Sequence, residues 1–206
     1  MPSGDIFTDY IYDHDATLVN TFPAHYRGVK VLCQKCGVEP PPMKTMGDWL
    51  QPPYEESFQR MGVVLPTEKL WKIYHSAVGK CQPKLFPGVI TVLRELKRRG
   101  KNVHLLTAND QTKWVLDVYR RHGIEDIFDS IVVGCSDKRE GIALILEASR
   151  KGALMVGDSV SDIRAAVDSG IVPIGFKNPY GNSDLLIKAG ARKVLSHHRE
   201  IFEFVK

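Results

Sequence analysis

The sequence lacks any long apolar run. Hydrophobic residues make up 43% of the 206 residues, but no stretch approaches the roughly 18 consecutive apolar residues that a membrane-spanning helix needs. The first five residues are polar and do not resemble a secretory signal. We therefore expect a cytoplasmic protein with no membrane partner.

Cysteine is also scarce. The chain has 4 cysteines, too few for its length to indicate a disulfide framework. Cys33 and Cys36 have the spacing of metal ligands, but no second pair of this kind follows them. We interpret them as thiols on a helix face and expect no zinc site.

Positive charge is not concentrated in one segment. The formal net charge is +4, with lysines and arginines spread along the chain. The densest basic group, residues 97–99, closes a predicted amphipathic helix, where cations complement the helix dipole. A nucleic-acid partner is therefore not expected.

Strand and helix patterns alternate through most of the chain. Residues 6–13 alternate in polarity and contain aromatic and β-branched side chains, which predicts a first strand. Further strands are predicted at 102–107, 130–133, 153–156, 171–175 and 193–195, with helices at 89–99, 112–122, 140–150, 162–169 and 199–205. This order favours an α/β fold, a Rossmann-like parallel sheet flanked by helices.

The first strand is separated from the others by a helical stretch. Helical patterns cover residues 18–36, 55–61 and 67–78, and a proline-containing linker follows at 80–87. We expect residues 1–18 and 84–206 to form an α/β catalytic core, and residues 19–83 to form a small inserted α-helical cap domain. Because ligands bind at the carboxyl ends of parallel strands, the site should lie there.

Two aspartates follow the first strand. Side chains on an extended segment alternate, so Asp13 and Asp15 can point the same way. A divalent cation such as Mg2+ would relieve the repulsion between them, leaving one carboxylate to attack phosphorus and the other to transfer a proton. The alternative is that a strand-end aspartate only stabilises the next turn.

Polar residues also follow two later strands. Thr107, Ala108 and Asn109 end the strand at 102–107, where a hydroxyl and backbone N–H groups can cradle an anion, although a threonine there can also simply cap a helix. Asp158, after Gly157, ends the strand at 153–156. Asp162 then fits a Ser-x-x-Asp capping pattern, which by itself explains that residue.

Lys138 begins a predicted helix, where its cation opposes the helix dipole. A nearby anion would account for this position, and a solvated lysine is the alternative. Together, these strand-end clusters contain a nucleophile, an acid/base, phosphate-oxygen donors, a cation and metal ligands. This set is typical of phosphoryl transfer.

The order and spacing of these clusters resemble the haloacid dehalogenase superfamily. Asp13-x-Asp15-x-Thr17 is similar to its first motif, Thr107 to its second, Lys138 to its third and Gly157-Asp158-Ser159-x-x-Asp162 to its fourth. The segment at 86–89 resembles the phosphoglycolate-phosphatase-like branch, in which a helical cap lies between the first two motifs. The resemblance implies a Mg2+-dependent phosphatase that acts on a small phosphorylated metabolite through an aspartyl-phosphate.

The resemblance also implies a role for each residue. Asp13 is the implied nucleophile and Asp15 the implied general acid/base, while Thr107 and Lys138, with Ala108 and Asn109, hold the transferring phosphoryl group. The implied metal site consists of Asp13, the backbone carbonyl of Asp15, Asp158 and, in a supporting position, Asp162.

The chain departs from the family pattern at three places. His14 replaces an apolar residue, Ala16 replaces a common glycine, and Arg139-Glu140 follows Lys138 in place of a Pro-x-Pro segment. Alternation should turn His14 away from the site, so we expect it to be buried and hydrogen-bonded.

Other readings share the same core residues. A sugar phosphomutase remains open, as does a non-catalytic binding module, although no expected catalytic residue is missing. A dehalogenase is disfavoured because Asp15 is present. A phosphonate hydrolase would need a cap lysine, and nothing marks Lys30, Lys35 or Lys44 as one. Selectivity is expected to come from a mobile cap, including the loop at residues 44–48.

Overall fold

The computed structural model describes residues 7–50, 54–146, 152–181 and 183–204. The chain divides into two compact units. The α/β unit comprises Met1–Val19, Leu85–Asn178 and Asn182–Lys206, and the helical unit comprises Asn20–Lys84 with Pro179–Gly181. The short segment Pro179–Gly181 lies outside the insert of residues 19–83 that the sequence suggests.

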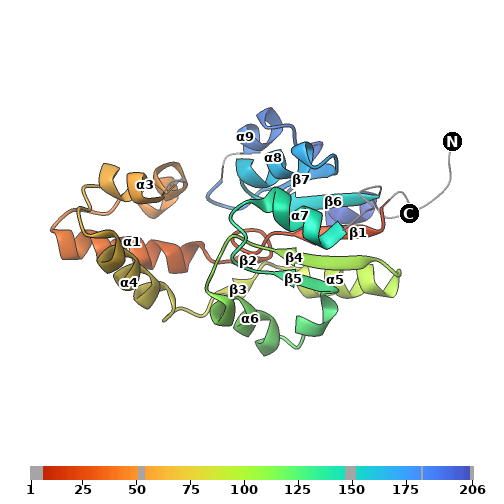
Figure 1. The fold of residues 1–206 in the computed structure, drawn as a ribbon, viewed down its shortest axis with the longest axis horizontal. Coiled ribbons are helices and arrows are strands. Elements are labelled where there is room, and N and C mark those ends of the chain that lie inside the picture. Colours follow the sequence, from red (N-terminus) through yellow and green to blue (C-terminus); the bar gives the residue numbers. More distant parts are fainter. Residues whose placement is uncertain (1–6, 51–53, 147–151, 182, 205–206) are drawn as a thin grey trace. The chain divides into compact units, whose positions relative to one another are not determined.

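The α/β unit is built on a six-stranded sheet in the order β5-β4-β1-β6-β7-β8, in which every pairing is parallel (Figure 1). The strands are β1 (Asp9–Tyr12), β4 (Asn102–Leu106), β5 (Ser130–Val132), β6 (Ala153–Gly157), β7 (Val172–Phe176) and β8 (Lys193–Leu195). The expected α/β fold is therefore confirmed. The first strand lies at the centre of the sheet, between β4 and β6, so its carboxyl end meets theirs.

Helices cover both faces of this sheet (Figure 1). They are α5 (Val89–Arg98), α6 (Thr112–Arg121), α7 (Lys138–Leu146), α8 (Val160–Asp168) and α9 (Ser183–Lys188), with 3-10 turns η2 (Glu125–Ile127) and η3 (His198–Phe204). Tyr10 and Tyr12 of β1 belong to the buried cluster with α5 and α6, whereas Ile11 belongs to the cluster with α7 and α8. The strand alternation thus sends successive side chains to opposite faces.

The helical unit pairs α1 (Phe22–Cys36) with α4 (Thr67–Val78). Gly28 permits this contact, because a Cβ there would lie 2.6 Å from the ring of Tyr74. The remaining elements are η1 (Met43–Thr45), α2 (Met46–Trp49) and α3 (Tyr54–Arg60). Within this unit Tyr180 stacks on Phe22, with ring centroids 3.9 Å apart and an interplanar angle of 5°.

Some predicted element boundaries were wrong. The helix predicted from residue 18 begins at Phe22, because β2 (Val19–Asn20) pairs with β3 (Lys84–Leu85) inside the predicted linker. That pairing joins segments far apart in sequence, and local periodicity cannot predict a pairing of this kind. The C-terminal helix predicted at 199–205 is present as a 3-10 helix, η3, whereas α9 was not predicted. Residues 147–150 and 205, at the ends of two predicted helices, lie outside the described residues.

No helix in the described ranges is both long and apolar enough to cross a membrane.

Candidate active site

Asp13 continues the first strand beyond its last formal residue. Its backbone N–H donates to the Val156 carbonyl at 3.0 Å, and its side chain is buried. Alternation places Asp13 on the face of Ile11, toward α7 and α8. His14 consequently lies on the opposite face, buried, with Nδ1 2.7 Å from the Tyr119 hydroxyl oxygen, as expected.

The backbone turns sharply after Asp15. Ala16 has a φ of 57°, the one positive φ among the described non-glycine residues. The turn is held by the Ala16 N–H donating to the Val19 carbonyl at 2.8 Å and the Val19 N–H donating to the His14 carbonyl at 3.0 Å. An alanine in the left-handed region costs about 1–2 kcal/mol. This strained residue comes directly after Asp15, within the first motif.

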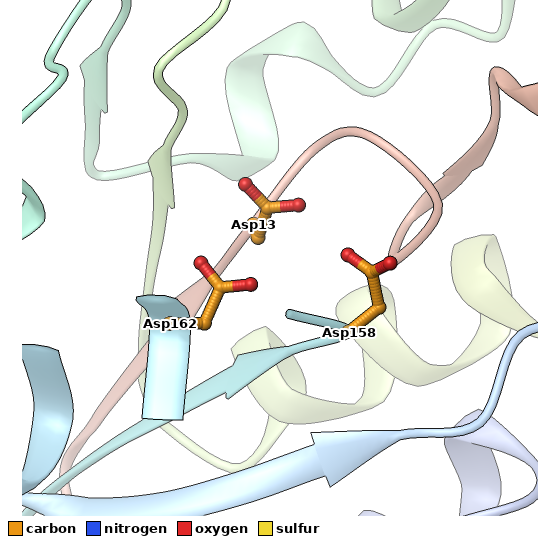
Figure 2. Close-up of side chains that lie close together, drawn as sticks. All are labelled: Asp13, Asp158 and Asp162. Carbon is orange, nitrogen blue, oxygen red and sulfur yellow. The ribbon is translucent and has the colours of Figure 1, made fainter. Parts of the chain in front are cut away.

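Three carboxylates converge beyond the strand ends. Asp13, Asp158 and Asp162 each offer one ligand oxygen, and these atoms all lie within 4.8 Å of one another. Figure 2 shows them coming from the end of β1, the tip of β6 and the start of α8, with their carboxylates turned toward a common space.

Lys138 supplies the cation of this cluster. Its Nζ donates to Asp13 Oδ1 at 2.5 Å and also to Asp162 Oδ1, and the lysine is buried. It is the first residue of α7, where a cation opposes the helix dipole. The two carboxylates account for that placement, so the solvated-lysine alternative is wrong.

Asp162 also caps the N-terminus of α8. Its backbone N–H and side chain form a capping box with Ser159, in which Asp162 Oδ2 accepts from the Ser159 N–H at 3.0 Å. Gly157 makes room for this turn, because a Cβ there would lie 2.3 Å from Asp162 Cβ. Asp162 can therefore cap α8 and belong to the cluster at the same time, because Oδ2 accepts from Ser159 and Oδ1 accepts from Lys138.

Asp158 is held by two donors. Thr17 Oγ1 donates to Asp158 Oδ1 at 3.3 Å, and Asn178 Nδ2 donates to Asp158 Oδ2 at 2.8 Å. Thr17 is itself placed by His198, whose Nε2 lies 3.0 Å from the Thr17 carbonyl oxygen. The orientation of Asp158 thus depends on residues from three distant parts of the chain.

The side chain of Asp15 lies apart from the three-carboxylate cluster. Its Oδ2 accepts from Asn109 Nδ2 at 3.0 Å, and the Asn109 Oδ1 accepts from the Gln111 N–H at 3.0 Å, which fixes the orientation of the amide. Thr107, buried at the end of β4, accepts from the Asn109 N–H at 3.1 Å. Because α6 begins at Thr112, Thr107 is not its cap. Ala108 is exposed.

Burial and neighbouring carboxylates raise the pKa values of two members of this cluster. Burial raises the pKa of Asp13 to about 7; the Lys138 cation opposes this shift, whereas the carboxylates of Asp162 and Asp15 add to it. Burial and the same kind of repulsion hold the pKa of Asp158 well above its usual range. Burial lowers the pKa of Lys138, but Asp13 and Asp162 outweigh it and keep that pKa above its usual value.

These residues fit a magnesium ion. Carboxylate oxygens are the ligands that Mg2+ favours, and three of them meet within reach of one another with a single lysine as counter-charge. An added divalent cation would favour the ionised carboxylates and would oppose the burial and the repulsion that raise the pKa values of Asp13 and Asp158. Within the described part of the chain this is the one group of three or more metal-binding side chains.

Two residues of the site were missed in the sequence. Asn178 lies just beyond β7, as Thr107 lies just beyond β4, so the same strand-end signal was available for it. His198 carries no such signal. It comes from η3 near the C-terminus and reaches the turn after β1 only through tertiary packing.

Comparisons with known proteins agree with this arrangement. The family described as haloacid dehalogenase-like hydrolase matches residues 10–176. A phosphoglycolate phosphatase from Vibrio cholerae is 33% identical over 128 residues, which cover 58% of this chain and 56% of that protein, so the chain spans about half of its length. A phosphoglycolate phosphatase from Yersinia pestis is 25% identical, covering 92% of this chain and 89% of that one.

The same fold occurs in a solved structure, a haloacid dehalogenase-like hydrolase from Streptococcus pneumoniae. It superposes with a TM-score of 0.84 at 22% sequence identity and covers 98% of this chain and 99% of its own. The family match includes Asp13, Thr107 and Asp158 at the strand ends and Lys138 at the start of α7. This chain belongs to the haloacid dehalogenase-like hydrolase family.

Proposed function

We propose that this protein is a Mg2+-dependent phosphatase that hydrolyses a small phosphorylated metabolite through an aspartyl-phosphate on Asp13. The observation that carries the proposal is the buried contact of Lys138 with Asp13 and Asp162, beside Asp158. A group of three acids and one cation, of which all but Asp158 are buried, costs free energy unless it serves a ligand that completes its charge balance.

In the first step, an oxygen of Asp13 attacks the phosphorus atom and the bond from phosphorus to the ester oxygen breaks. Asp15 gives its proton to that leaving oxygen. In the second step, water attacks the phosphorus of the aspartyl-phosphate and gives a proton to Asp15. The bond from phosphorus to the Asp13 oxygen breaks, which releases inorganic phosphate and restores both carboxyl groups.

The other residues bind and position the phosphoryl group. Lys138 would neutralise its charge, and the hydroxyl of Thr107 and the backbone N–H of Ala108 would donate to its oxygens. The Asn109 N–H, which donates to Thr107 Oγ1 in this structure, would exchange that acceptor for a phosphoryl oxygen. Asn109 additionally holds Asp15 through its side-chain amide, which orients the acid toward the ester oxygen.

Mg2+ would be held by Asp13, Asp158 and the backbone carbonyl of Asp15, with Asp162 in support, and would neutralise negative charge on the phosphate when bound.

The substrate we propose is a small phosphorylated acid of the phosphoglycolate type. The support comes from the relatives in Vibrio cholerae and Yersinia pestis, which are named phosphoglycolate phosphatases. We also propose that residues 19–83 are a mobile cap that sets selectivity, including residues 44–48, which lie in η1 and α2 and not in the expected loop. An aspartyl-phosphate must be shielded from stray water while it forms, and a lid supplies that protection.

The test is phosphate release from 2-phosphoglycolate, p-nitrophenyl phosphate and a panel of sugar phosphates, with Mg2+ and with EDTA. We expect release with Mg2+ and its loss with EDTA. Asp13→Asn should lose more than about a thousandfold of kcat while melting cooperatively, because an amide is not an anionic nucleophile. Full activity of Asp13→Asn or in EDTA would refute the mechanism. Isomerisation of a sugar phosphate without phosphate release would favour the mutase.

A further inference from the structure

Asp158 is oriented by a residue that lies outside the four sequence motifs. Asp158 Oδ1 accepts from Thr17, which belongs to the first motif, and Oδ2 accepts from Asn178 Nδ2 at 2.8 Å. An ionised carboxylate accepts and does not donate, so the amide must present its NH2 group here. One donor on each oxygen leaves a lone pair on both for a metal ion.

The sheet places Asn178 beside Asp158. Asp158 follows β6, Asn178 follows the neighbouring β7, and the two strands pair in register as far as Gly157 and Gly175. The Lys177 N–H donates to the Leu195 carbonyl at 2.8 Å, so the chain is still tied to β8 one residue before Asn178. Asn178 is itself buried.

The chain crosses into the helical unit directly after Asn178. Pro179 restricts the backbone, and the ring of Tyr180 stacks on Phe22. The Tyr180 carbonyl lies so near Gly47 that a Cβ on that glycine would be 2.4 Å from the oxygen. Asn178 is therefore the last residue of the α/β unit before this crossing, and the bond of Lys177 to β8 holds the backbone beside it, as an orienting side chain needs.

The side chain that Asn178 presents to Asp158 is uncharged, which suits a carboxylate that binds a metal ion. A lysine or arginine against Asp158 would compete with a divalent cation, as Lys138 already balances Asp13 and Asp162. A neutral amide fixes the rotamer of Asp158 without supplying a competing charge. Such outer partners of metal ligands typically account for 10–100-fold in metal affinity.

We propose that Asn178 is a positioning residue for Asp158 and sets the affinity of the acidic cluster for Mg2+, an inference that rests on the proposed function. It holds Asp158 in the orientation that binds the ion before the ion arrives. Asn178 takes no part in bond making or proton transfer.

The test is a Mg2+ titration of the full chain followed by the melting temperature, which reports binding without turnover. Asn178→Ala should weaken Mg2+ binding by about 10–100-fold. Asn178→Leu, which has the same branched shape and number of side-chain heavy atoms but no donor, should do the same and guards against a cavity effect in the alanine variant. In kinetics the Mg2+ concentration for half-maximal activity should rise in parallel, while kcat at saturating Mg2+ changes far less.

Asn102→Ala is the matched control. Its Nδ2 donates to Asp9 Oδ1 at 2.9 Å, the same kind of amide–carboxylate bond, at the opposite end of the sheet. Asn102→Ala should leave Mg2+ affinity unchanged. Wild-type affinity in both Asn178 variants would overturn the inference and leave a working Mg2+ phosphatase untouched. A wild-type protein that neither binds Mg2+ nor releases phosphate would instead refute the proposed function and the inference with it.

Discussion

At the scale of single residues, the site depends on where strand alternation sends each side chain. Asp13 and His14 are neighbours in sequence, yet one joins Lys138 and the other joins Tyr119 on the opposite face. The buried histidine therefore packs on the face of the sheet that α6 covers, whereas Asp13 faces α7 and the other carboxylates. A catalytic role for His14 is not needed to explain its position.

Ala16 gives the first prediction at this scale. Its φ of 57° is one that glycine adopts without strain. Ala16→Gly should raise the free energy of unfolding by up to about 1 kcal/mol, since the relieved strain exceeds the added freedom of the unfolded chain. Urea unfolding of the wild-type and variant proteins measures the difference.

Ala16→Val is the opposing variant. A β-branched side chain is strongly disfavoured at positive φ, so this change should destabilise the protein. Turnover should fall with it, because the same turn carries Asp15. If valine is as stable as alanine and glycine is less stable than both, the turn is not strained as described.

At the scale of elements, η3 connects the C-terminal part of the chain to the turn after β1. His198 contacts the Thr17 carbonyl through Nε2 and stacks on Phe176, with ring centroids 4.2 Å apart. Burial lowers the pKa of His198 to about 4; the bond to the Thr17 carbonyl opposes this shift and the neighbouring His197 adds to it. The imidazole is therefore neutral at physiological pH, with its Nε2–H as donor.

This lowered pKa predicts how stability changes with pH. In the unfolded chain the histidine binds a proton below about pH 6.5, whereas in the folded chain it does so only near pH 4. The unfolded state thus binds more protons in this window, and the free energy of unfolding should fall by roughly 3 kcal/mol as the pH drops from 6.5 to 4. Urea unfolding at a series of pH values measures this slope.

His198→Gln is the control for this prediction. Glutamine keeps an N–H donor for the Thr17 carbonyl but does not titrate, so the part of the slope between pH 6.5 and 4 that belongs to His198 should disappear. An unchanged slope in His198→Gln would mean that other groups produce the acid sensitivity.

At the scale of the whole molecule, the chain forms an α/β unit and a helical unit that share more than two connections. Besides the crossings near Asn20 and Lys84, the segment Pro179–Gly181 returns to the helical unit and stacks Tyr180 on Phe22. Removing residues 21–83 would therefore take away the ring on which Tyr180 stacks and expose Tyr180 to solvent.

The cap proposal gives the prediction at this scale. A variant in which a short Gly-Ser linker replaces residues 21–83, combined with Tyr180→Ser, keeps the paired strands β2 and β3. It should hydrolyse p-nitrophenyl phosphate slowly and lose its preference for 2-phosphoglycolate, since selectivity and water exclusion would both go with the cap. Ratios of kcat/KM for the two esters measure this.

The full-length Tyr180→Ser protein is the matched control and should keep that preference. A deletion variant that folds and still discriminates between the two esters as the full chain does would show that the α/β unit alone sets selectivity.

The sequence by itself determined the parallel α/β fold and the strand ends at which the candidate residues stand. Alternating strand and helix patterns are local, and polar residues directly after apolar strands such as β1, β4 and β6 are visible without coordinates. Because parallel strands end at one edge of the sheet, their placement near one another followed from the topology.

Only the tertiary structure decided how those residues pair. Lys138 donates to Asp13 and Asp162. The side-chain amides of Asn109 and Asn178 donate to Asp15 and Asp158, respectively. The strands β2 and β3, the contact of His198 with Thr17 and the stack of Tyr180 on Phe22 likewise join segments far apart in the chain. Such contacts form because buried polar groups need hydrogen-bond partners, and no local periodicity in the sequence records which partners the fold brings to them.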